Sequence, residues 1–300
     1  MIIKLLLVIL ALVHVAATAA NAKNVRNFIF GNSLIHHLSP SDETNVPHWV
    51  HRLAVSAGNR YAVEGRWGFP EIFAKELPPI HQWAFKGVPG VGTQRGAPFN
   101  RAHYDAIIMN PSNFVQYKAP DAQLEFVGFG RKTQVDFAVT LFDWLEKNGS
   151  GGSTRYFIYE GWADMDRFAK PFPPSSDKMK AFHVYNRTEY HDWYVRYVRL
   201  VNEGRPGLDV RLIPVASVLS KLFSETPLKE IQPTDLYSDD APHGTATTYF
   251  LAAVAVYSML YDSKAPVDFV VPTSVHHLVR DHYKEIIGII CAEVINGDKC

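Results

Sequence analysis

The sequence predicts an α/β domain built around an open, parallel, five-stranded sheet. Short apolar runs alternate along the chain with longer amphipathic stretches, which is the pattern of repeated strand–helix–strand units. The short runs are apolar enough to be buried on both faces, as the strands of a parallel sheet are. The chain has 300 residues, of which 47% are hydrophobic, so it can bury one sizeable core, and nothing in its composition demands a second domain.

The N-terminal 22 residues have the pattern of a secretory signal peptide. Lys4 precedes an apolar run over 5–15, and small residues follow as far as the cleavage pattern Ala20-Asn21-Ala22. The apolar run is too short to span a bilayer comfortably, and no later run reaches the roughly 20 apolar residues that a membrane helix needs. We therefore expect residues 1–22 to be removed and 23–300 to form a single exported domain, periplasmic or extracellular, without stable membrane insertion.

The mature chain offers five strands and four long helices in alternation. The expected strands are 25–30, 60–64, 104–109, 155–160 and 209–215, and the expected helices are near 47–57, 132–147, 189–203 and 244–260. The third helix carries Tyr190, Trp193, Tyr194 and Tyr197 at helical spacing, which predicts packing against the sheet. Residues 148–154 are predicted to be an ordinary loop, whereas the irregular stretches 86–103 and 169–180 are long enough to be lids or binding edges.

Charge and cysteine usage exclude several classes of function. The 30 basic residues balance the 30 acidic ones, so no bulk field favours binding to nucleic acid. Cys291 and Cys300 are the two cysteines, and in an exported chain we expect them to form one disulfide that pins the C-terminus. Neither they nor the pairs His36-His37 and His276-His277 have the spacing of a zinc site, so we expect no metal and no other cofactor.

The first strand is followed by a serine in a position suited to chemistry. In the segment "NFIFGNSLIHH", Gly31 permits a sharp turn and Ser33 lies at the carboxyl edge of the sheet, where open α/β folds bind their ligands. Backbone N–H groups at the start of a following helix would be available to an oxyanion. A serine after a strand also commonly caps a helix, so the position alone leaves both interpretations open.

A base and an orienting acid occur together near the C-terminus. Asp240 and His243 lie three residues apart in "SDDAPHG", just before a long apolar stretch, and this spacing can bring a carboxylate onto an imidazole. Pro242 and Gly244 favour a turn there. Asp239 is the reserve candidate for the carboxylate. The alternative is that Asp240 caps a helix and His243 is an exposed loop residue.

Together these segments resemble the SGNH (GDSL-type) hydrolases. "FIFGNSL" is similar to the family's nucleophile block, with Asn in place of the commoner Asp, and "DAPH" is similar to its C-terminal acid–base block. The resemblance implies a flavodoxin-like three-layer α/β/α sandwich with a five-stranded parallel sheet. It also implies that Ser33 is the nucleophile, His243 the general base and then general acid, and Asp240 the orienting carboxylate.

The family's two middle blocks are expected to supply the oxyanion hole together with the Ser33 N–H. In "VEGRWGFPEI" we favour Gly68 over Gly65, because Gly68 heads the next expected helix. "IIMNPSNF" departs from the family's G-x-N-D pattern, with Pro111 for the glycine and Phe114 for the aspartate. Counting from the strand favours Asn113, with Asn110 next, although either could serve a turn around Pro111.

The substrate is expected to be an ester, most simply an O-acetyl group on a carbohydrate. Trp162 and Glu160 follow the fourth expected strand and enter the same edge as Ser33, and an aromatic ring beside polar groups suits a sugar. Asn32, beside the nucleophile, is the third expected substrate contact. The alternatives are a lipid or short-chain carboxylester hydrolase, and a non-catalytic glycan-binding or acyl-transfer protein. The nucleophile elbow of α/β-hydrolases is excluded because Ile35 stands where G-x-S-x-G needs glycine.

Overall fold

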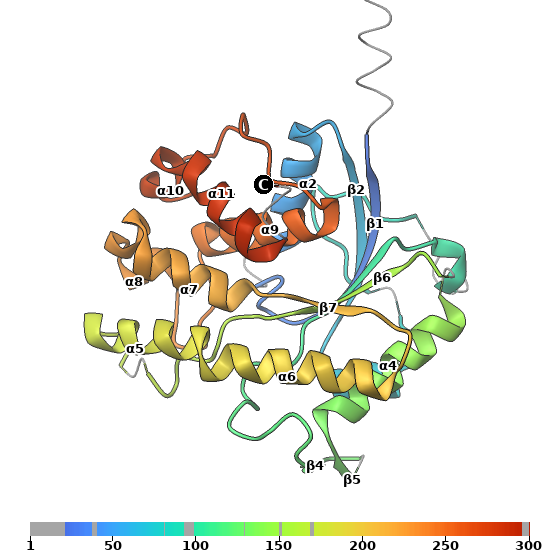
Figure 1. Ribbon diagram of the computed structural model, residues 1–300. Coiled ribbons are helices and arrows are strands. Elements are labelled where there is room, and N and C mark those ends of the chain that lie inside the picture. The colour runs from blue at the N-terminus through green and yellow to red at the C-terminus, as the bar shows by residue number, and fades with distance from the viewer. Residues whose placement is uncertain are drawn as a thin grey trace, which may run out of the picture.

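A five-stranded parallel sheet forms the centre of the chain in the computed structural model, which describes residues 22–37, 41–80, 82–92, 99–128, 130–149, 152–168, 171–295 and 300. The strands are ordered β2-β1-β3-β6-β7 (Figure 1). Their bounds are β1 Asn24–Gly31, β2 Arg60–Trp67, β3 Ala106–Met109, β6 Arg155–Tyr159 and β7 Val210–Ile213. Because β6 and β7 are the fourth and fifth strands of this sheet, the order is the flavodoxin-like one. The predicted fold class is confirmed.

Helices cover both faces of the sheet and make the outer two layers. α2 (Val46–Ser56), α9 (Ala246–Tyr261) and α11 (Tyr283–Val294) lie on one side, and α4 (Gln134–Asn148) and α6 (Glu189–Gly204) lie on the other (Figure 1). α7 (Val215–Glu225) contacts both α9 and α11. The shorter elements are α3 Pro70–Lys75, η1 Phe99–Ala102, α5 Ser176–Arg187, η2 Pro227–Glu230, α8 Pro233–Leu236, α10 His277–Asp281 and the hairpin β4 Leu124–Phe126 with β5 Gly130–Lys132.

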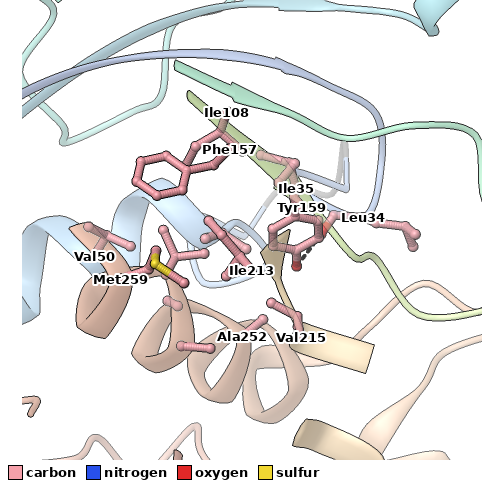
Figure 2. Packing of buried hydrophobic residues seen from close by; sticks show 14 of the residues in the cluster. Leu34, Ile35, Val50, Ile108, Phe157, Tyr159, Ile213, Val215, Ala252 and Met259 are labelled. Atoms are coloured by element: carbon pink, nitrogen blue, oxygen red, sulfur yellow. Dashed lines mark hydrogen bonds between the residues drawn. The ribbon is translucent and has the colours of Figure 1, made fainter. Parts of the chain in front are cut away.

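One half of the core lies between the sheet and α9, and the other half lies between the sheet and the helices α4 and α6. Every residue of α9 from Thr247 to Tyr261 is buried, so this helix is apolar on all sides and not only on one face. Figure 2 shows Ala252 and Met259 of α9 in the same buried cluster as Ile213, with Ile108 and Phe157 of the sheet above them. Because α9 is enclosed in this way, the end of the loop that precedes it is held in place. That loop carries His243.

Local signals explain where the predicted helices begin. The Asn45 side chain accepts the His48 N–H at the start of α2. Thr133 and Asp136 form a capping box at the start of α4, each side chain bonded to the other's backbone N–H. The four expected helices are confirmed with ends that differ by one or two residues from the prediction.

Three of the longer helices fall where the sequence predicted something else or nothing. α5 begins at Ser176, inside the stretch 169–180 that was expected to be irregular. α7 begins at Val215, the last residue of an expected strand, because the apolar run continues past Pro214 and a continuous apolar run does not by itself distinguish a strand from a helix. α11 was not predicted, although it buries Ile286, Ile287 and Ile290.

The remaining predictions concern the signal-like N-terminal segment, membrane insertion and the C-terminal disulfide. The expected signal peptide lies outside the described residues except for Ala22. Within the described part of the chain, no helix combines the length and apolar character needed to cross a bilayer. Cys291 and Cys300 form the predicted disulfide, which ties the terminal residue to α11.

Candidate active site

Ser33 lies in a tight turn that begins where β1 ends. The Asn32 carbonyl accepts the N–H groups of Ile35 and His36, at 3.0 and 3.2 Å, and the Asn32 side-chain oxygen accepts the Leu34 N–H at 3.0 Å. Ser33 itself is half-buried, and its N–H makes no hydrogen bond to the described part of the chain. Asn32 is only 2% exposed. The hydrogen bonds of Asn32 therefore build the turn. This differs from the prediction that Asn32 contacts the substrate.

Gly68 lies beside this turn, but its N–H already has a partner. β1 and β2 pair in register, with Gly31 opposite Trp67, and the Gly68 N–H donates to the Gly31 carbonyl at 2.8 Å. Gly68 has φ +152°, and a Cβ there would come within 3.0 Å of Phe73. The glycine is thus needed to join the two strand ends, and its N–H is not free for the expected oxyanion role. Gly65 is also not available, because it lies within β2 opposite Ile29.

His243 is held by Asp239, the reserve candidate, and not by Asp240. His243 Nδ1 lies 2.6 Å from Asp239 Oδ2, and the His243 backbone N–H donates to Asp239 Oδ1 at 2.9 Å. Asp239 Oδ1 also accepts the Ala241 N–H at 3.1 Å. Asp240 makes no hydrogen bond to the ring within the described part of the chain. This corrects the expected acid by one residue, because the turn through Ala241 directs the first aspartate of the pair back onto the imidazole.

Two contacts join the Ser33 turn to the His243 loop. The His37 ring stacks on the His243 ring with their centres 4.0 Å apart, and His37 is four residues after Ser33. The Tyr249 hydroxyl, in the second turn of α9, donates to the Ser33 carbonyl at 2.5 Å. Segments more than 200 residues apart in the sequence are therefore held at one place on the carboxyl edge of the sheet. Tyr249 was not predicted to be part of the site.

The electrostatics of the pair favour a charged carboxylate beside the ring. Partial burial raises the pKa of Asp239, but the hydrogen bonds from the His243 side chain and backbone outweigh it, and the net pKa lies below its usual value. Burial, followed by the neighbouring His243, lowers the pKa of His37, so the stacked ring is kept neutral at physiological pH. A charged aspartate and a neutral stacking partner suit an imidazole that must accept a proton.

Asn113 and Asn110 differ in how far they are engaged elsewhere. Asn110 is fully buried after β3, and its side-chain nitrogen donates to the Tyr159 carbonyl at 3.3 Å. Asn113 is half-buried and lines a small cavity, and its side-chain nitrogen makes one long contact of 3.5 Å to the Trp162 carbonyl. Each amide nitrogen carries two hydrogens and retains a donor, but Asn110 is fully buried, whereas Asn113 lines the cavity. Of the two, Asn113 fits the oxyanion role better.

Trp162 and Glu160 are both buried and bonded to other parts of the fold. This differs from the prediction that they contact the substrate. Trp162 is 1% exposed, and its indole N–H donates to the Pro242 carbonyl at 2.8 Å, next to His243. Glu160 is fully buried; its carboxylate lies 2.9 Å from His191 Nδ1 and accepts the Ser217 N–H at 3.1 Å. Trp162 therefore anchors the loop that carries His243, and Glu160 ties β6 to α6 and α7. Within the described residues, no group of three or more potential ligands could hold a metal ion.

Comparison with known proteins adds one distant structural similarity. No family model matches the chain, and no curated protein matches it. Among solved structures, the chain is similar to Est24, a carbohydrate acetylesterase from Sinorhizobium meliloti, with 12% sequence identity. The similarity covers 78% of this chain and 97% of that one, with a TM-score of 0.35. At that TM-score the likeness is distant and carries no functional argument.

Proposed function

We propose that the chain is a serine ester hydrolase with Ser33 as nucleophile, His243 as base and Asp239 as orienting acid. The observation that carries the proposal is the Asp239–His243 pair, held to the Ser33 turn through the stacked His37 ring and the Tyr249 hydrogen bond. An aspartate on Nδ1 fixes the tautomer in which Nε2 accepts a proton. A serine hydroxyl needs such a base, because it is a weak nucleophile at neutral pH.

The reaction follows from these roles. His243 takes the Ser33 Oγ proton as Oγ attacks the ester carbonyl, and the resulting oxyanion is stabilised by the Ser33 N–H and the Asn113 side chain. The imidazolium then gives the proton to the alcohol oxygen, which leaves, and the acyl group stays on Ser33. Water, activated by the same imidazole, releases the acid and restores the serine. The resemblance to SGNH hydrolases supports the same assignment of Ser33 and His243.

We further propose that the protein is exported and that its substrate is an acyl ester of a carbohydrate. The signal-like segment 1–22 and the disulfide between Cys291 and Cys300 support export, because disulfides form and persist in oxidising compartments. An external location would give the enzyme access to polymeric substrates.

Covalent labelling tests the nucleophile without knowledge of the natural substrate. The chain 23–300 is treated with diisopropyl fluorophosphate and its peptides are analysed by mass spectrometry. We expect a single adduct on Ser33, prevented by Ser33→Ala and slowed strongly by His243→Ala, with acetate release from p-nitrophenyl acetate lost in the same variants. An unlabelled Ser33 in a folded chain, or equal ester turnover by Ser33→Ala, would contradict the proposed function.

A further inference from the structure

A cavity that the proposed function does not use lies between α5, α7, η2 and α8, on the left of Figure 1. α5 and η2 both pack against α7, and Leu236 of α8 is part of the cavity wall. The cavity has a volume of about 670 Å³, which is in the range of sites for small organic molecules. Its wall combines polar and apolar groups, and neither Ser33 nor His243 is among them.

His183 is a buried polar side chain that the fold leaves open to this cavity. It is only 5% exposed, and its Nδ1 lies 3.2 Å from Ser220 Oγ. Its Nε2 makes no hydrogen bond to the described part of the chain, yet it is not sealed in the core, since the ring forms part of the cavity wall. A polar nitrogen in this position costs free energy unless it finds a partner. A ligand that bonds to Nε2 would supply one.

The electrostatics of the cavity favour an uncharged partner for this nitrogen. Burial lowers the pKa of His183 to about 4, so the ring is neutral at physiological pH. Two exposed cations in the wall have acidic neighbours: Lys180 lies 3.7 Å from Asp177, and Lys229 is adjacent in sequence to Glu230. A charged group bonded to Nε2 would therefore lose its hydration without gaining an opposite charge.

From this arrangement we infer that the cavity is a second binding site, for a small uncharged alcohol or phenol with an apolar body. A hydroxyl group both donates and accepts hydrogen bonds, so it can pair with His183 Nε2 whichever ring nitrogen carries the hydrogen. The apolar body packs against the side chains of Met179, Phe223 and Leu236 in the wall. None of these contacts involves Ser33, so the site does not depend on the proposed function.

The cavity wall leads directly into the segment that carries Asp239. Leu236 lines the cavity, and its carbonyl accepts the Thr245 N–H at 2.9 Å. Two residues later, the Ser238 N–H donates to the His243 carbonyl at 2.8 Å. A ligand packed on Leu236 therefore restrains residues 236–239 without touching the proposed catalytic groups.

Titration calorimetry on the chain 23–300 tests the site with three probes that share one apolar body: 4-propylphenol, propylbenzene and 4-propylbenzoate. We expect the phenol to bind about tenfold more tightly than the other two, because it alone supplies an uncharged hydroxyl. His183→Phe should weaken phenol binding about tenfold and leave propylbenzene binding unchanged. Ser220→Ala is the matched control: it removes the partner of Nδ1 and leaves Nε2 in the cavity, so the phenol should keep its advantage.

Hydrogen exchange followed by mass spectrometry locates the bound phenol. 4-Propylphenol should slow exchange in 179–184 and 228–239, with the same affinity in the wild-type and Ser33→Ala chains. Ser224→Trp, at an exposed position in the cavity wall, should abolish binding and protection, and it tests the site even if His183→Phe does not fold. Equal affinity for phenol and propylbenzene, tighter binding of the benzoate, or protection confined to other segments would overturn the inference. Ester hydrolysis enters none of these measurements, so the proposed function can fail or stand separately.

Discussion

Asp239 holds His243 through two atoms of the same carboxylate, one on the ring Nδ1 at 2.6 Å and one on the backbone N–H at 2.9 Å. The ring and the loop that carries it are therefore oriented by one side chain. Asp240 is adjacent in sequence and has the same chemistry, yet it makes neither contact. The two neighbouring aspartates therefore allow the effect of position to be tested while the residue type is kept the same.

Asp239→Asn should lower kcat for ester hydrolysis by about 10⁴-fold, because an amide on Nδ1 favours the wrong imidazole tautomer. Asp240→Asn, the matched control, should change kcat only slightly. Steady-state kinetics on one acetyl ester measures both, with circular dichroism to confirm that each variant is folded. Equal losses in the two variants, or a larger loss in Asp240→Asn, would contradict the role assigned to Asp239.

The indole of Trp162 should matter for catalysis through the loop that it supports. Trp162→Phe leaves the Pro242 carbonyl without its 2.8 Å donor, so we expect about 1 to 3 kcal/mol of lost stability and a lower kcat with little change in KM. Trp193→Phe is the control: the Trp193 indole likewise donates to a carbonyl at 2.7 Å, but that carbonyl belongs to Lys118 and not to the loop that carries His243. Urea unfolding should show similar losses for both variants, whereas only Trp162→Phe should lower kcat. A loss of kcat in Trp193→Phe of the same size would show that general destabilisation is the cause.

The two asparagines after β3 should separate catalysis from stability. Asn113→Ala should lower kcat by about 10²- to 10³-fold, as removal of one oxyanion donor does, with little effect on unfolding. Asn110→Ala should mainly reduce stability, because Asn110 is fully buried and bonded to the Tyr159 carbonyl. Kinetics and urea unfolding on both variants give the comparison. If Asn113→Ala retained full kcat, the oxyanion would have to be bound by other donors.

Much of the fold follows from the sequence because parallel strands and long helices leave strong local patterns. All five strands of the sheet and the helices α2, α4, α6 and α9 have buried apolar runs or amphipathic periods. The position of Ser33 follows from the same argument, since it needs only the end of β1. α7 and α11 were missed because their apolar residues resemble a strand or a featureless run until tertiary contacts bury them.

The site was less predictable because it depends on which way side chains point. Trp162 follows a strand at the correct edge, but only packing decides that its ring is buried under the His243 loop while Trp67 and Phe114 face solvent. The sequence does contain a signal that favours Asp239 over Asp240. An aspartate whose oxygen accepts the N–H two residues later is a common turn, and "DDAPH" with a proline at 242 fits it when counted from Asp239.

The buried Glu160–His191 pair should make stability depend on pH above neutrality. The hydrogen bond with Glu160 raises the pKa of His191, and burial raises the pKa of Glu160. A histidine whose pKa is raised by folding stabilises the native state fully below its unfolded pKa of about 6.5, and this contribution is lost as the pH rises through the folded pKa. Deprotonation of His191 also leaves the Glu160 carboxylate buried without a cationic partner, so both groups make the folded chain less stable as the pH rises.

We therefore expect the free energy of unfolding to fall between pH 6 and pH 9 in the wild-type chain, and His191→Gln to remove most of that slope while lowering stability at pH 6. His277→Gln is the control, because His277 forms a similar pair with Asp281 at 3.4 Å but on the exposed surface, where ion pairs contribute little. Urea unfolding at several pH values measures the slope in all three chains. A slope in His191→Gln equal to that of the wild type would show that other groups set the pH dependence, and that the Glu160 carboxylate does not rely on His191 for its charge compensation.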